Sequence, residues 1–153
     1  KAMQRVVAQA WAQRAPNLAL RSPREAVVLA SLIEKETGRA ADRALISGVF
    51  HNRLRLGMRL QTDPSVIYGL GDEFNGNLQR HHLRRDGPYN TYTRGGLPPT
   101  PIAMPGLASL QAALHPAATD ALYFVARGDG SSQFSRTLRE HNAAVRRYQL
   151  GKP

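Results

Sequence analysis

The pattern of apolar and polar positions predicts helices over residues 3–13, 23–37, 41–56, 106–115 and 138–148. The second of these is apolar nearly all round, which is typical of a buried central helix. Ser22 before Pro23, with Glu25 three positions on, forms a capping-box sequence that marks its start, and Gly38 marks its end. A second capping-box sequence, Thr137 to Glu140, marks the start of the last helix.

The character of the chain changes between residues 57 and 105, where glycine and proline recur. This stretch predicts one short helix, with Asp63 as its cap and Pro64 next, inside a long ordered loop region of the kind that is usually functional. Residues 121–126 and 132–136 predict two short strands joined as a hairpin through "RGDGS". The sequence therefore predicts a single α+β domain over residues 1–153, dominated by helices and with a small β element.

Composition and charge narrow the class of partner. The 153 residues include 21 Lys and Arg against 11 Asp and Glu, which gives a formal net charge of +10. This surplus favours an anionic partner such as nucleic acid, an acidic membrane face or an acidic polymer. The chain has no cysteine, so disulfides, thiolate metal sites and cysteine nucleophiles are excluded.

Two glutamates close the predicted central helix, in the sequence "ASLIEKETG". Glu34 and Glu36 lie two positions apart, which on a helix separates their side chains by roughly 160°. They cannot act together as a paired acid and base, so at most one of them faces a cleft. A carboxyl group partly buried against apolar neighbours can keep its proton near neutral pH, as a general acid requires. A solvated helix end remains the alternative for either residue.

The Gly/Pro-rich segment offers polar and aromatic side chains suited to binding sugars. These are Gln61, Asn75, Tyr89, Asn90 and Tyr92, although asparagine and tyrosine are also ordinary loop residues.

Four separated stretches carry a family resemblance. They are "ASLIEKET", "HNRLRLGMRLQTDPSVIYGLG", "YNTYTRGGLPPTPIAMPG" and "ALHPAATDALYFVARGDGSSQFSRTLREHN", which occur in this order over about residues 26–148. Together they resemble the endolytic murein transglycosylase family, also called MltG or YceG-like. The resemblance implies a fold similar to lysozyme and other transglycosylases.

The resemblance also implies a reaction. Enzymes of this family cleave nascent peptidoglycan between N-acetylmuramic acid and N-acetylglucosamine and leave a 1,6-anhydro-N-acetylmuramic acid end. By resemblance the catalytic glutamate is Glu34, acting first as acid and then as base, with Glu36 as the second choice. Asp63 is a candidate for electrostatic support of the transition state, and a helix cap is its alternative role.

Further expectations follow from the same resemblance. Sugar contacts are expected from Gln61 and Thr62, followed by Asn90 and Tyr92, with no cofactor and no metal. Glycan strands are the expected substrate, and peptidoglycan synthases (penicillin-binding proteins) are expected partners. The family implies a single-pass protein of the bacterial inner membrane with its catalytic domain in the periplasm, so that an anchor and a LysM-like subdomain would lie upstream of this chain.

Two other functions compete with this hypothesis. A nucleic-acid-binding domain would use the basic cluster "QRHHLRRD", residues 79–86, and the net positive charge. A peptidoglycan-binding module without turnover would keep the loop amides and aromatics but would not need a protonated acid. Metal and serine hydrolase chemistry are disfavoured, because the chain has neither an HExxH nor a GxSxG pattern.

Overall fold

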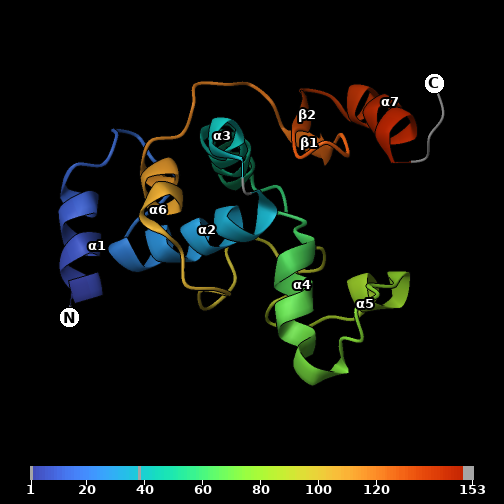
Figure 1. The fold of residues 1–153 in the computed structure, drawn as a ribbon, viewed down its shortest axis with the longest axis horizontal. Helices are drawn as coiled ribbons and strands as arrows, with labels where there is room; N and C mark the ends of the chain where they lie inside the picture. The colour runs from blue at the N-terminus through green and yellow to red at the C-terminus, as the bar shows by residue number, and fades with distance from the viewer. Residues whose placement is uncertain (1, 38, 150–153) are drawn as a thin grey trace.

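The computed structural model describes residues 2–37 and 39–149, and several of its helices pack around one central helix (Figure 1). The elements are α1 (Ala2–Ala12), α2 (Pro23–Glu36), α3 (Ala40–Leu56), α4 (Asp63–Leu70), the 3₁₀ turn η1 (Gly71–Glu73), α5 (Arg80–Arg84), α6 (Leu107–Leu114), β1 (Tyr123–Ala126), β2 (Ser132–Ser135) and α7 (Leu138–Tyr148). The predicted helix-dominated α+β class is confirmed. The predicted stop at Gly38 lies outside the described residues.

Helix α2 forms the centre of the core. Its buried residues lie on almost every side of the helix, and they are Ala26, Val28, Leu29, Ala30, Ser31, Leu32 and Ile33. The helix packs against α1, α3, α4 and α6, with its most extensive contact on α6. Each buried leucine or isoleucine side chain contributes roughly 1.5–3 kcal/mol to folding, so this packing fixes the position of α2 firmly. The end of α2 is therefore a rigid place from which to project a side chain.

Local signals in the sequence set the helix boundaries. The Ser22 hydroxyl accepts a hydrogen bond from the backbone N–H of Glu25 at 3.2 Å, as the capping sequence predicts, while the Glu25 carboxylate accepts from the Arg21 N–H at 2.7 Å. Thr137 and Glu140 form the predicted reciprocal capping box at the start of α7. Gly57 ends α3 in the left-handed conformation, with φ of 72°, which glycine adopts without strain.

The long loop after α5 is held on α2 by side-chain hydrogen bonds. The Ser31 hydroxyl accepts from the backbone N–H of Ile102 at 3.0 Å, and Arg24 donates to the Pro99 carbonyl at 2.9 Å. The hydroxyls of Tyr89 and Thr100 lie 2.7 Å apart. These contacts explain how a proline-rich segment without regular structure can be ordered, as the sequence predicts.

The hairpin and α7 form the C-terminal part of the fold. Strands β1 and β2 pair antiparallel, with Tyr123 opposite Ser135, and α7 packs against both strands. In Figure 1 they lie together at one end of the molecule, joined to α6 by a segment that passes over α3. That segment lies so close to α3 that a Cβ at Gly48 would stand 2.8 Å from the Ala117 carbonyl oxygen. Asn52 also donates to the Thr119 carbonyl at 2.8 Å, so the connection to the hairpin is fixed.

The localisation implied by the resemblance is wrong for this chain as described. A single-pass membrane protein needs a helix of roughly 20 apolar residues. Within residues 2–37 and 39–149, no helix has both the length and the apolar character to cross a membrane.

Candidate active site

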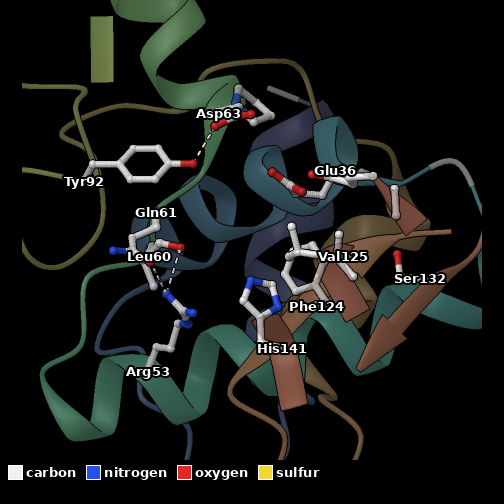
Figure 2. A pocket seen from close by; sticks show the side chains of 14 residues that line it. Glu36, Arg53, Leu60, Gln61, Asp63, Tyr92, Phe124, Val125, Ser132 and His141 are labelled. Carbon is white, nitrogen blue, oxygen red and sulfur yellow. Dashed lines mark hydrogen bonds between the residues drawn. The ribbon is translucent and has the colours of Figure 1, made fainter. Parts of the chain in front are cut away.

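The two glutamates at the end of α2 face different surroundings, as their helical spacing predicts. Glu36 lines a pocket of about 380 Å³, the site drawn in Figure 2, together with residues of the 60–64 segment, the hairpin and α7. Glu34 does not line this pocket and instead meets the start of α6. Glu36 therefore lies in a cleft, whereas Glu34 makes a structural contact with another helix.

Glu34 acts as an N-terminal cap for another helix. Its Oε1 accepts hydrogen bonds from the Gly106 backbone N–H at 2.8 Å and from the Ser109 hydroxyl at 2.9 Å. Gly106 is the N-cap of α6, where a negative charge is favourable. These two hydrogen bonds hold the pKa of Glu34 below its ordinary value. A carboxyl group that is already ionised is poorly suited to donate a proton, so the geometry disfavours the predicted catalytic role of Glu34.

Removal of this cap should lower stability without affecting turnover. Glu34→Ala leaves the Gly106 N–H and the Ser109 hydroxyl without their acceptor, and we expect a loss of about 1 kcal/mol in the free energy of unfolding. The pKa of Glu34 is lowered by folding, so this contribution is present above its ordinary value of 4.5 and is lost as the pH falls through the folded value. Urea titrations at pH 7 and pH 3 measure both effects. A loss of equal size at both pH values would contradict the capping role.

The surroundings of Glu36 shift its pKa in the opposite direction, upward. It is the last residue of α2, it keeps part of its surface exposed to the pocket, and the chain after it turns away in extended conformation at Thr37. Burial disfavours its charged form and raises its pKa to about 7, and the negative charge of Asp63 acts in the same direction. Glu36 can therefore carry a proton near neutral pH, which is the property expected of a general acid.

Two sequence motifs meet beside Glu36. The "QTD" segment pairs with the "NTY" segment through a buried cluster of hydroxyls: the Thr91 hydroxyl accepts from the Thr62 backbone N–H at 2.8 Å and lies 3.0 Å from the Ser65 hydroxyl. The Gln61 N–H also donates to the Thr91 carbonyl at 3.2 Å. This pairing holds Gln61 with a φ of 55°, a left-handed conformation that costs a residue other than glycine of order 1 kcal/mol.

The pairing brings Asp63 and Tyr92 into direct contact at one side of the pocket (Figure 2). The Tyr92 hydroxyl donates to Asp63 Oδ1 at 2.5 Å, and both residues line the pocket with Gln61. Asp63 is the first residue of α4, whose N-cap is Thr62, so the alternative of Asp63 as the helix cap is wrong. Burial and the hydrogen bond to Asp63 raise the pKa of Tyr92, so the phenol stays protonated and remains a donor.

The other two predicted sugar contacts lie behind the pocket wall. Thr62 is buried within the hydroxyl cluster, and Asn90 is buried where it donates to the Leu83 and Arg85 carbonyls at 3.0 and 2.8 Å. Neither residue lines the pocket. The structure gives both a positioning role, because they fix the segments that carry Asp63 and Tyr92.

Several pocket residues were not expected from the sequence. They are Arg53 on α3, Phe124 and Ser132 on the hairpin, and His141 on α7. The spacing of α7 could have indicated His141, because it precedes Val145, another lining residue, by one helical turn. No comparable signal marks Arg53, whose role depends on carbonyl groups from two other segments.

The pocket presents a glutamate that can hold a proton near neutral pH, an aspartate, an arginine and several neutral hydrogen-bonding side chains. In the described part of the chain, no three histidine, aspartate or glutamate side chains gather closely enough to hold a metal ion. The arrangement suits acid–base chemistry on a neutral polar substrate.

Comparisons with known proteins identify the family of the chain. A model of the YceG-like family matches residues 1–147. The chain belongs to the YceG-like family. It is 48% identical over 126 residues to a Bacillus subtilis protein named endolytic murein transglycosylase, covering 82% of this chain and 35% of that protein. A Streptococcus pneumoniae protein of the same name is 34% identical over 127 residues, which cover 79% of this chain and 23% of that one.

A solved structure supports the same assignment. The crystal structure of a YceG-like protein from Listeria monocytogenes superimposes with a TM-score of 0.73 at 47% identity, over 80% of this chain and 39% of that one. The family expected from the sequence motifs is thus confirmed. This YceG-like chain spans about a third or less of the length of the curated relatives it matches.

Proposed function

We propose that this chain is a lytic transglycosylase of peptidoglycan in which Glu36 is the single catalytic acid and base. The observation that carries the proposal is the environment of Glu36, a glutamate in a pocket whose pKa is raised to about 7. The names of the relatives support peptidoglycan as the substrate class. The proposal has three further parts. The fold is lysozyme-like, residues 1–153 form one catalytic domain, and peptidoglycan synthases are partners.

The proposed reaction proceeds in two steps with one carboxyl group. Glu36 donates its proton to the glycosidic oxygen as the bond from that oxygen to C1 of N-acetylmuramic acid breaks. The carboxylate of Glu36 then takes the proton from the 6-hydroxyl of the same sugar as O6 bonds to C1. The glutamate ends in its original protonated state, and the product carries a 1,6-anhydro ring.

Asp63 and Tyr92 are assigned supporting roles. The negative charge of Asp63 keeps Glu36 protonated before the first step and favours the positive charge that develops at C1. The hydrogen bond from Tyr92 holds Asp63 in place. Gln61 presents a side-chain amide to the pocket as a sugar contact.

Mass analysis of the products tests the reaction class. The chain is incubated with nascent peptidoglycan, and the masses of the released fragments are determined by mass spectrometry. Anhydro ends are expected, whereas reducing ends would identify a hydrolase. Glycan binding without release of fragments would favour a peptidoglycan-binding module, and salt-sensitive binding of duplex DNA without cleavage would favour a nucleic-acid-binding domain.

Asp63→Asn should shift the pH dependence of the reaction. Asparagine keeps an oxygen that can accept from Tyr92 but removes the negative charge, so the pKa of Glu36 should move from about 7 toward its ordinary value of 4.5. The acid form of Glu36 is then lost at a lower pH. We expect the alkaline limb of the kcat/KM profile to move to lower pH. Asp72→Asn, an exposed aspartate outside the pocket, is the control and should leave the limb in place. An unchanged limb in Asp63→Asn would contradict the coupling.

A further inference from the structure

The imidazole of His141 lines the pocket and has no role in the proposed reaction. Its imidazole stacks on the ring of Tyr123, with centroids 5.0 Å apart and planes at 21°. The Arg53 guanidinium lies 5.0 Å from the centroid of the same Tyr123 ring. Figure 2 shows the imidazole directed into the pocket, toward the space between Glu36 and Gln61. His141 is therefore held in a fixed orientation that faces the acid.

The hydrogen bonding of this imidazole is incomplete. Nδ1 is buried and has no hydrogen-bond partner among the protein atoms of the described residues. A buried N–H without an acceptor is rarer and less favourable than a buried acceptor without a donor. The neutral tautomer that suits this position has Nδ1 bare and the proton on Nε2, so the ring presents an N–H donor to the pocket.

The charges around His141 favour its neutral form. Burial, followed by the positive charge of Arg53, lowers the pKa of His141 below its ordinary value. The ring can therefore act as a hydrogen-bond donor at neutral pH without placing a positive charge beside Glu36. A neutral donor of this kind suits a neutral acceptor on the substrate.

We propose that His141 binds the acetamido carbonyl oxygen of an N-acetylated sugar beside Glu36 through its Nε2 hydrogen, and so positions the glycan for cleavage. This inference rests on the proposed function, because it takes the glycan as the substrate. The sugars of peptidoglycan carry hydroxyls, ether oxygens and an acetamido group, and the amide carbonyl is a strong neutral acceptor with two lone pairs. His141 would thus make the site selective for N-acetylated over de-N-acetylated glycan.

The test combines a variant with a modified substrate. His141→Phe keeps a ring that can stack on Tyr123 but has no donor. We expect its kcat/KM on N-acetylated glycan strands to fall about tenfold, which corresponds to the loss of one hydrogen bond. On chemically de-N-acetylated strands the variant and the wild type should be nearly equal, because neither can make the bond. The preference of the wild type for N-acetylated strands should therefore shrink in the variant.

Two further variants separate binding from folding. His141→Gln offers an amide donor and should recover part of the activity on N-acetylated strands, while His115→Gln changes an exposed histidine outside the pocket and should behave as wild type. Equal losses on both substrates, or wild-type kinetics in His141→Phe, would overturn the inference while leaving the proposed function intact. Absence of anhydro products from the wild type would instead overturn the proposed function, and this inference with it.

Discussion

Glu36→Gln is expected to lower the rate of anhydro-product release about 1,000-fold, while Glu34→Gln retains most of the wild-type rate. General acid–base catalysis contributes roughly 10²–10⁴-fold, and here one residue is assigned both proton transfers. Glutamine has nearly the same shape as glutamate but cannot donate an acidic proton. Liquid chromatography and mass analysis of the products at pH 6 measure both variants under the same conditions. Loss of activity in Glu34→Gln with retention in Glu36→Gln would reverse the assignment in favour of the residue expected from the sequence.

The stability of Glu36→Gln provides the control for folding. Folding raises the pKa of Glu36 from 4.5 to about 7, so between these values the folded protein binds this proton more tightly than the unfolded chain. The stabilisation is complete below pH 4.5 and is lost as the pH rises through 7. Glutamine has no such proton to lose. The difference between the Tm of the variant and the Tm of the wild type should therefore change in favour of the variant as the pH rises from 5 to 8. A constant difference in Tm would mean that the carboxyl group is not desolvated.

Arg53→Met is expected to lower the free energy of unfolding by about 3 kcal/mol and to impair turnover as well. Arg53 is buried, and it donates to the Leu122 and Arg59 carbonyls, both at 2.7 Å, and to Gln61 Oε1 at 3.3 Å. Methionine fills a similar volume but leaves these acceptors unpaired, and hydrogen bonds from a charged donor contribute roughly 1.5–3 kcal/mol each. Urea denaturation and product release measure the two effects.

Two other arginine variants test whether the geometry of the guanidinium matters. Arg53→Lys keeps the charge but has no planar fork, so it should fall between the wild type and Arg53→Met. Arg55→Met removes an exposed arginine two positions along α3 and should change stability by about 0.5 kcal/mol or less. Equal stability of Arg53→Met and Arg55→Met would contradict the conclusion that the hydrogen bonds of Arg53 stabilise the fold.

Much of the fold could be predicted from local signals. Apolar positions around α2 indicated its burial, and Ser22 and Thr137 marked two helix starts, because each of these signals depends on nearby residues alone. The α+β class and the hairpin followed from the same kind of pattern. Five-residue α5 was not predicted, since a helix so short has almost no periodicity.

The site could be predicted only in part, because its geometry depends on packing between distant segments. The helical spacing showed that Glu34 and Glu36 diverge, but it could not show which of them meets the start of α6. Gln61, Asp63 and Tyr92 were expected beside a catalytic glutamate predicted to be Glu34, and they line the pocket of Glu36, the second choice. Thr62 and Asn90 have similar chemistry and occur in the same motifs, but the direction of each side chain places them behind the wall.

The pocket draws its walls from both ends of the chain, since the acid comes from α2 and the facing wall from the hairpin and α7. A truncation at residue 120 would retain every residue that the sequence motifs nominate, including the acid, Gln61, Asp63 and Tyr92. It would also leave Glu36 on a solvent-exposed surface. Bulk water would then solvate the carboxylate, and its acidity would move toward that of a free glutamate.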